Sequence, residues 1–307
     1  LFHEAGVPGQ SLQLIIGGRD TGNQLTTNEF INGVAFTGST QAARKININL
    51  ANTNGPIKTL IAETGGQNVM FVDSSSLKEQ VIDDIVKSAF FSAGQRCSAL
   101  RVVYVQDEIA EEYWNYLNEA MQELHIGDPN HADTDIGPII NKSSLERLNA
   151  YVNDLKTKNE FIECNNEAVT NGYFLKPVAF KIGNIAEIDG EKFGPILHFI
   201  SFKNDELDEI LRQVNSTGFG LTMGVHSRIN EKANKIFEKA KIGNFYLNRD
   251  IVGAVVGVQP FGGQGLSGTG PKAGGPNYLK SFVNEKTFTD NVMATGGNID
   301  LLNKNNQ

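Results

Sequence analysis

The sequence has little cysteine, no long apolar run and no block of like charges among its 307 residues. Two cysteines are too few for a disulfide framework, so we expect a reducing compartment, the cytoplasm. No apolar stretch approaches the roughly 18 residues of a membrane-spanning helix. The net charge of −8 argues against a nucleic-acid partner, which would need a basic surface to bind.

Histidine is scarce as well, and its pattern is not that of a metal site. The five histidines are scattered, and neither cysteine has a second cysteine or a histidine at zinc-ligand spacing. We therefore expect no metal ion. The amino terminus lacks a methionine and the basic and apolar regions of a signal peptide, so we expect the sequence to be the C-terminal part of a longer polypeptide.

What is present is a regular alternation of short apolar runs and amphipathic stretches. Strands that alternate with helices are typical of an α/β fold built on a parallel sheet. The predicted strands are residues 12–16, 33–36, 59–62, 100–105, 173–180, 196–202, 221–226, 243–247 and 281–289. The predicted helices are residues 40–51, 76–94, 109–124, 143–157, 205–214 and 230–240, and Ser76 with Glu79 fits a capping box at the start of the second.

Cys97 is the first candidate for chemistry. It follows a predicted helix that ends at Gly94, which would place the thiol on a loop at the mouth of a cleft. A thiol attacks a carbonyl as the thiolate, and the neighbouring Arg96 is expected to lower the pKa of this thiol. By itself the stretch fits a buried structural cysteine equally well. Cys164 lies in a strand-like stretch away from the other motifs and is interpreted as structural.

Two further motifs follow predicted strands. Glu63 ends an apolar strand ahead of two glycines, at the strand end where ligands bind in open α/β sheets, and its carboxylate could serve as a general base. Residues 37–40 join a strand to a helix, and backbone N–H groups at such a helix start receive phosphate. A solvated glutamate at a turn and a helix cap without a ligand are the alternatives.

The stretches Glu191 to Pro195 and Pro260 to Gly263 are weak signals when each is taken alone. Taken with the earlier motifs, their order and spacing resemble the aldehyde dehydrogenase superfamily over nearly the whole chain. The series is Thr-Gly-Ser, Glu-x-Gly-Gly, Gly-Gln-x-Cys, Glu-x-Phe-Gly-Pro and Pro-Phe-Gly-Gly.

This resemblance implies an aldehyde dehydrogenase fold and NAD as the cofactor. Cys97 would attack the aldehyde carbon, its backbone N–H would form half of the oxyanion hole, and Glu63 would activate the water that hydrolyses the thioester. The implied cofactor contacts are Gly38 and Ser39 at the pyrophosphate, Thr64 at the carboxamide, Glu191 at the nicotinamide ribose, and Phe193 beside it.

The resemblance also implies three regions. Residues 1–65 would be the end of an incomplete NAD-binding domain with a partial parallel sheet, and residues 66–258 an α/β catalytic domain. Residues 259–307 would hold a glycine-rich return segment, a final strand and a tail. The segment between Gly253 and Gly275 contains nine glycines, which predicts a loop.

A finer resemblance points to a substrate. The segments 95–101, 251–261 and 268–276 resemble the L-glutamate γ-semialdehyde (1-pyrroline-5-carboxylate) dehydrogenase module of bacterial bifunctional proline-utilisation proteins. That branch implies that the backbone N–H groups of Gly253 and Ala254 and the Ser98 hydroxyl bind the substrate carboxylate, with Phe261 beside its aliphatic stem. A dehydrogenase for another aldehyde, such as succinate semialdehyde, and a non-catalytic module that serves assembly remain the alternatives.

The resemblance places parts of the site outside the sequence. The second oxyanion donor, the early cofactor strands and a proline dehydrogenase module would all precede Leu1. We therefore expect the remainder of the same polypeptide as a partner, a homo-oligomer at full length, and weak NAD binding by the isolated chain.

Overall fold

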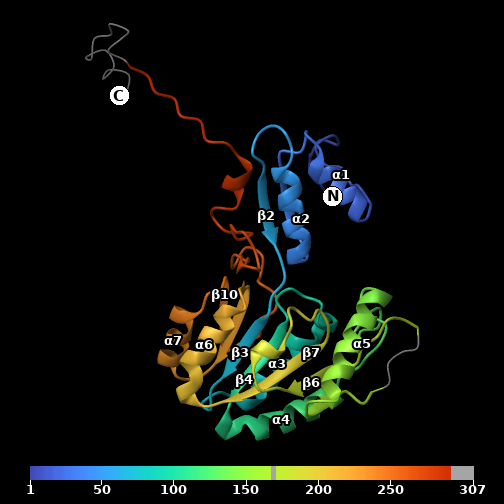
Figure 1. Ribbon diagram of the computed structural model, residues 1–307, viewed down its shortest axis with the longest axis vertical. Coiled ribbons are helices and arrows are strands. Elements are labelled where there is room, and N and C mark those ends of the chain that lie inside the picture. The colour runs from blue at the N-terminus through green and yellow to red at the C-terminus, as the bar shows by residue number, and fades with distance from the viewer. Residues whose placement is uncertain (167–170, 292–307) are drawn as a thin grey trace.

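The computed structural model describes residues 1–166 and 171–291, which form a small lobe and a large lobe joined end to end (Figure 1). The small lobe contains α1 (Arg19–Thr27), β1 (Gly33–Thr37), α2 (Thr40–Ala51) and β2 (Thr59–Glu63). The two strands pair in parallel, with Thr37 opposite Glu63 at their carboxyl ends. The amide of Asn49 on α2 donates to the hydroxyl of Thr26 on α1 at 2.9 Å, which ties the two helices together.

The large lobe is built on a seven-stranded sheet of order β10-β9-β3-β4-β7-β6-β5. Every neighbouring pair is parallel except β5 and β6. Its strands are β3 (Asn68–Val72), β4 (Leu100–Gln106), β5 (Phe161–Glu163), β6 (Val178–Lys181), β7 (Ile196–Phe202), β9 (Thr222–His226) and β10 (Asn244–Leu247). The helices are α3 (Lys78–Phe90), α4 (Asp107–Gln122), α5 (Lys142–Lys156), α6 (Leu207–Ser216) and α7 (Asn230–Lys239). Short 3-10 turns lie at Phe91–Gly94, Ile185–Glu187, Asn204–Glu206 and Leu279–Phe282, and β8 (Phe219–Gly220) pairs with β11 (Gln264–Gly265).

Helices cover both faces of this sheet, so its central strands are buried on both sides. All residues of β3 and β4 are buried, as expected for a covered parallel sheet. On one face Trp114 of α4 packs on Phe199, with ring centroids 5.2 Å apart. On the other face Tyr151 of α5 bonds to the ring of His198 at 2.8 Å. Because successive residues of a strand face opposite sides, Phe199 and His198 mark the two layers of the core.

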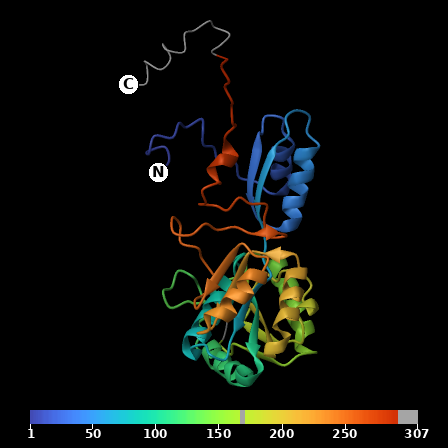
Figure 2. The same ribbon diagram turned by 90° about the vertical axis from the view of Figure 1, so that its left-hand side faces the viewer.

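The connection between the lobes determines where a site can form. β2 ends at Glu63 and β3 begins at Asn68, so the carboxyl end of the small sheet adjoins the amino edge of the large one. The parallel strands of the large sheet all begin at this edge (Figures 1 and 2). The segment after β10 returns to the junction, where the backbone N–H of Thr64 donates to the carbonyl of Ser267 at 2.9 Å.

Most predicted elements are confirmed within a few residues, and α2 matches its predicted range. Two predicted strands are wrong: residues 12–16 form an exposed coil, and residues 281–289 form the end of a 3-10 turn followed by coil. A strand requires a neighbouring strand to satisfy its backbone, and these apolar segments pair with none in the described ranges 1–166 and 171–291.

Two predicted boundaries also need correction. Strand β6 begins only at Val178, because Pro177 lacks the N–H that a sheet needs. The predicted capping box is wrong, since α3 starts one residue later than it requires and the hydroxyl of Ser76 bonds instead to Tyr113 at 3.0 Å. The asparagine-rich end of the sequence lies outside the described residues.

The packing of α4 on the sheet generates a stability prediction. Leu117 is fully buried, so Leu117→Ala should lower the free energy of unfolding by about 2–5 kcal/mol through lost apolar contact and a residual cavity. Leu14→Ala is the matched control, because that leucine is 86% exposed. Urea unfolding followed by circular dichroism measures both, and an equal loss in the two variants would contradict the packing described here.

Candidate active site

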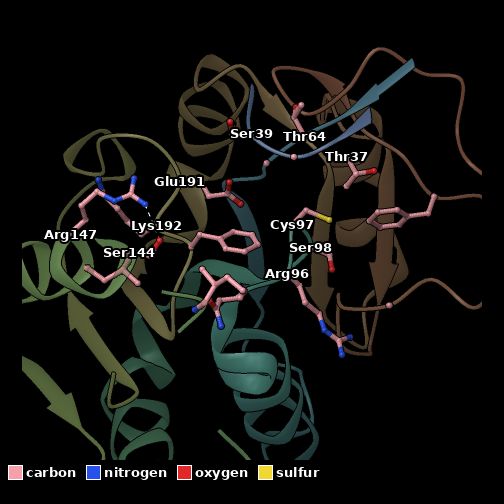
Figure 3. Close-up of a pocket in the computed structure, with 18 of the residues that line it drawn as sticks. Thr37, Ser39, Thr64, Arg96, Cys97, Ser98, Ser144, Arg147, Glu191 and Lys192 are labelled. Atoms are coloured by element: carbon pink, nitrogen blue, oxygen red, sulfur yellow. Dashed lines mark hydrogen bonds between the residues drawn. The ribbon is translucent and has the colours of Figure 1, made fainter. Parts of the chain in front are cut away.

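A cavity of about 970 Å³ lies at the junction of the two lobes (Figure 3). The structure brings ten of the eleven predicted site residues to its wall: Gly38, Ser39, Thr64, Cys97, Ser98, Glu191, Phe193, Gly253, Ala254 and Phe261. Glu63, the eleventh, adjoins Thr64 but does not line the cavity. Cys97 therefore faces a space that residues distant in the sequence enclose together.

The loop that presents Cys97 is formed by an abrupt end to α3. The helix stops at Phe90, and the predicted continuation to Gly94 is wrong. Ser92, Ala93 and Gly94 take left-handed backbone angles, with φ of 57°, 53° and 62°. A side chain at Gly94 would overlap the carbonyl of Gly194, so glycine is required there. The reversal delivers Cys97 to the amino edge of β4.

Two buried groups fasten this loop, and neither was singled out from the sequence. The side-chain amide of Asn68 donates to the carbonyls of Cys97 and Ala99 at 2.7 and 2.8 Å. The fully buried guanidinium of Arg101 donates to the carbonyl of Arg96 at 3.1 Å. Asn68 lies two residues after the Glu-x-Gly-Gly motif that contains Glu63, but only the folded chain shows that its amide crosses to the cysteine loop.

The thiol of Cys97 is less acidic than the sequence predicts. Burial and the nearby carboxylate of Glu191 raise the pKa of the thiol, and the backbone N–H groups of Ser98 and Cys97 lower it. The prediction that Arg96 lowers this pKa is wrong. The Nε of Arg96 donates to the hydroxyl of Ser92 at 2.9 Å, and its guanidinium points away from the sulfur (Figure 3).

Glu63 is held behind the cavity wall by the glycine-rich return segment. Its Oε2 accepts a hydrogen bond from the N–H of Gly263 at 2.8 Å, and its Oε1 is buried without a partner among the described residues. A side chain at Gly262 would come within 2.6 Å of Oε1, so the backbone itself encloses the carboxyl. Burial raises the pKa of Glu63 to about 7, although the Gly263 N–H and Lys272 lower it.

Glu191 presents a second buried carboxylate on the opposite wall. Its Oε1 accepts from the N–H of Gly66 at 3.0 Å and lies 3.6 Å from Arg101. Burial raises the pKa of Glu191, while Arg101 and the Gly66 N–H lower it. Gly65 has no room for a side chain beside this carboxylate. Phe193, 41% exposed, extends the same wall.

The small lobe contributes the start of α2. The hydroxyl of Ser39 accepts a hydrogen bond from the N–H of Ala42 at 3.2 Å, so this serine caps the helix as well as lining the cavity. The N–H of Gly38 donates to the carbonyl of Glu63 at 3.1 Å, which joins the ends of the two strands. The positive end of the helix dipole therefore borders the cavity.

The third part of the wall is the loop after β10, and a buried brace shapes it. Gly253 has φ of +78°, and a side chain there would lie 4.0 Å from the guanidinium of Arg96. Asp250, three residues earlier, accepts from the N–H of Val252 at 3.2 Å and forms an ion pair with Lys87 at 2.8 Å. The sequence offered no signal for this brace, because Lys87 lies on α3, 163 positions from Asp250.

Several further residues of the cavity wall were not predicted from the sequence. Ile140, Ser144, Arg147, Tyr151 and Lys192 also line the cavity. Ser144, Arg147 and Lys192 lie on the side of Glu191 away from Cys97 (Figure 3). Arg147 and Lys192 place two cations there in a chain of net charge −8. Cys164, predicted to be structural, is 1% exposed in the core.

The part of the chain that the structure describes, residues 1–166 and 171–291, contains no cluster of three or more His, Cys, Asp or Glu side chains suited to a metal ion. None of its helices has the length and apolar character needed to cross a bilayer.

The Cys97 loop and the two carboxyls of Glu63 and Glu191 thus come together at the junction of two parallel α/β sheets. The chain belongs to the aldehyde dehydrogenase family, whose model matches residues 1–288, and the predicted fold class is confirmed. It is 46% identical over 287 residues to "Bifunctional protein PutA" of Escherichia coli (strain K12), covering 90% of this chain and 22% of that protein. It is 33% identical over 296 residues to "1-pyrroline-5-carboxylate dehydrogenase" of Geobacillus sp. (strain WCH70), covering 94% of this chain and 57% of that protein.

Solved structures agree with this assignment. A crystal structure of Bradyrhizobium japonicum Proline Utilization A (PutA) matches with a TM-score of 0.91 and 47% identity, covering 96% of this chain and 30% of that one. A Thermus thermophilus 1-pyrroline-5-carboxylate dehydrogenase matches with a TM-score of 0.85 and 31% identity, covering 92% and 55%. The chain thus spans about a fifth to three fifths of the length of these relatives.

The raised pKa of Glu63 makes a prediction about stability and pH. A carboxyl whose pKa rises to about 7 on folding favours the folded state at low pH, and this contribution is lost as pH rises from about 4.5 to about 7. Glu63→Gln removes the titration, so the variant should gain stability relative to the original chain across that interval. Chemical unfolding at a series of pH values measures the difference, and a gap independent of pH would show that Glu63 ionises normally.

Proposed function

We propose that this chain supplies the catalytic part of an NAD-dependent dehydrogenase that oxidises L-glutamate γ-semialdehyde to L-glutamate in proline catabolism. The observation that carries the proposal is the position of Cys97 in one cavity between a wall suited to NAD and a loop suited to a carboxylate. The names of the relatives, PutA and 1-pyrroline-5-carboxylate dehydrogenase, support the same substrate. We propose a cytoplasmic protein in which this region belongs to a longer, homo-oligomeric polypeptide.

The residues of one wall fit NAD. The positive start of α2, with Gly38 and Ser39, suits the pyrophosphate, and the carboxylate of Glu191 suits ribose hydroxyls. Thr64 would face the carboxamide and Phe193 would pack beside the ribose. When bound, NAD would supply the acceptor for the hydride that leaves the substrate. These assignments follow the proposed domain division, with residues 1–65 in the NAD-binding part, 66–258 in the catalytic part and 259–307 returning to the junction.

The chemistry of the chain itself centres on the thiol. The thiolate of Cys97 would attack the aldehyde carbon to form a thiohemiacetal, with the developing oxyanion bonded to the backbone N–H of Cys97. Loss of hydride leaves a thioester on Cys97. A water molecule that gives its proton to Glu63 would then hydrolyse the thioester, which releases the carboxylic acid and regenerates the thiol.

The part of the cavity wall formed by Gly253 and Ala254 fits the carboxylate of the substrate. Gly253 and Ala254 expose backbone N–H groups without bulky side chains, and the hydroxyl of Ser98 lies at the same wall. Arg96 does not lower the pKa of the thiol as expected. Its guanidinium lies beside Gly253 instead. Phe261 would pack against the aliphatic stem between the carboxylate and the aldehyde. A carboxylate would therefore meet donors and a positive charge together.

The two catalytic roles are tested together in the full-length polypeptide that contains this chain. Glu63→Gln should still form the thioester and release one equivalent of NADH in a burst, but turn over at least about a hundredfold more slowly, because its base is lost. Cys97→Ala is the control and should give neither burst nor turnover. Rapid-mixing absorbance measures both, and aldehyde oxidation that persists in Cys97→Ala would rule out the proposed function.

The substrate is tested by removing one positive charge. Arg96→Met should raise KM for L-glutamate γ-semialdehyde by about tenfold to a hundredfold, the range expected for a lost charged hydrogen bond, with a smaller change in kcat. The KM for an uncharged aldehyde of similar length should stay the same, and that aldehyde is the matched control. Steady-state kinetics with both substrates, and with succinate semialdehyde, provide the comparison. Equal effects on charged and uncharged aldehydes would place the carboxylate elsewhere.

A further inference from the structure

Asn68 makes the contacts that fix the backbone on either side of the nucleophile. It begins β3 and is 2% exposed. Its Nδ2 donates to the carbonyls of Cys97 and Ala99 at 2.7 and 2.8 Å, and its Oδ1 accepts from the backbone N–H of Thr222 at 3.1 Å. The opposite orientation of the amide would set its oxygen against two carbonyls, so the partners themselves determine which atom is the nitrogen.

The bond to the Cys97 carbonyl determines the direction of the next N–H. In a trans peptide the carbonyl of one residue and the N–H of the next point to opposite sides of one rigid plane. Because Asn68 draws the Cys97 carbonyl toward the start of β3, the N–H of Ser98 is turned away from β3. Together with the N–H of Cys97, this N–H lowers the pKa of the Cys97 thiol.

Other contacts hold the rest of the cysteine loop, but the Asn68 amide holds the peptide between Cys97 and Ser98. The N–H of Ala99 closes a turn on the carbonyl of Arg96 at 3.0 Å. The hydroxyl of Thr222 reaches the Ser98 carbonyl only at a long 3.4 Å. The backbone of Gly66 passes so close that a side chain there would approach the Cys97 carbonyl at 2.7 Å. The Asn68 amide is thus the strong hydrogen-bond donor to the Cys97 carbonyl.

We propose that Asn68 is a positioning residue for the nucleophile, which holds the peptide between Cys97 and Ser98 so that the Ser98 N–H faces the sulfur and stabilises the thiolate. The inference rests on the proposed role of Cys97, but it concerns the thiol alone and is measured without aldehyde or NAD. Asn68 acts through the backbone, so its effect appears in the titration of Cys97 and in the rate at which the free thiol reacts.

The experiment is alkylation of Cys97 by iodoacetamide over a pH series that spans the titration of the thiol, with the modified peptide measured by mass spectrometry. Peptide-level detection separates Cys97 from the buried Cys164. Asn68→Ala should raise the apparent pKa of Cys97 by about one unit, so that alkylation below that pKa is about tenfold slower. The limiting rate at high pH, where the thiol is fully ionised, should stay close to that of the original chain.

Two further variants grade the effect. Asn68→Asp removes both donors and adds a carboxylate beside the loop, so its shift should be larger than that of Asn68→Ala. Asn68→Ser keeps one short donor and should fall between the original chain and Asn68→Ala. The serine variant also keeps the test decisive if Asn68→Ala does not fold, which circular dichroism would show.

Gln67→Ala is the matched control. Gln67 is the adjacent residue, is 6% exposed, and donates through its own amide to the carbonyl of Ile188 at 3.3 Å, away from the cysteine loop. Its removal also takes out a buried amide, but Cys97 should titrate as in the original chain. An equal shift in Gln67→Ala would mean that general loosening is the cause, and would overturn the proposal.

The two proposals fail in different ways. An unchanged alkylation profile in folded Asn68→Ala, or in folded Asn68→Ser where the alanine variant is unfolded, overturns the positioning role and leaves the proposed function in place. Aldehyde oxidation that survives Cys97→Ala overturns the proposed function, whatever Asn68 does.

Discussion

The short connection between β2 and β3 is the constraint on which the arrangement of the site depends. Residues 64–67 join the carboxyl end of one parallel sheet to the amino edge of another. Strands in a parallel sheet share one direction, so every parallel strand of the large lobe begins at the same edge. The cysteine loop before β4, the Glu191 segment before β7 and the start of β9 must therefore meet where β2 ends. The site forms between a carboxyl-end surface and an amino-end surface.

The two buried carboxyls at this junction, Glu63 and Glu191, differ in how well neighbouring groups compensate their charge. Arg101 compensates Glu191 from within the protein, at the cost of burying a cation whose Nε has no partner among the described residues. Among the described residues, Glu63 accepts one backbone hydrogen bond, from Gly263, and Lys272 also lowers its pKa, but burial outweighs both. Arg101 and the Gly66 N–H offset part of the effect of burial on Glu191, whereas Glu63, with its pKa raised to about 7, can accept and release a proton near neutral pH. Gly65 beside Glu191 and Gly262 beside Glu63 allow the backbone to approach each carboxyl closely.

The sequence predicted which residues meet at the cavity better than it predicted their geometry. Cys97 and the predicted wall residues could be singled out because each lies in a short motif, and a motif is a local property of the chain. The strand predicted at residues 12–16 failed because a local apolar run cannot reveal whether another strand lies beside it. Arg96 was assigned to the thiol for its proximity in sequence, but the turn after Gly94 directs its side chain elsewhere. Glu63 lies at the carboxyl end of β2, as the sequence predicts, whereas the Cys97 loop lies at the amino end of β4.

The same distinction explains why Asn68 and Asp250 could not be found from the sequence. Asn68 bonds to Cys97, 29 positions away, and Asp250 bonds to Lys87, 163 positions away on α3. Neither hydrogen bond is marked by a characteristic residue pattern in the sequence. Burial of Cys97 favours the neutral thiol, and within residues 1–166 and 171–291 no cation offsets this effect at the sulfur. Among the described residues, what opposes burial is a pair of backbone donors, and such donors are useful only if their peptide planes are held. The reactivity of the cysteine therefore depends on how the sheet supports its backbone as much as on the residues beside it in sequence.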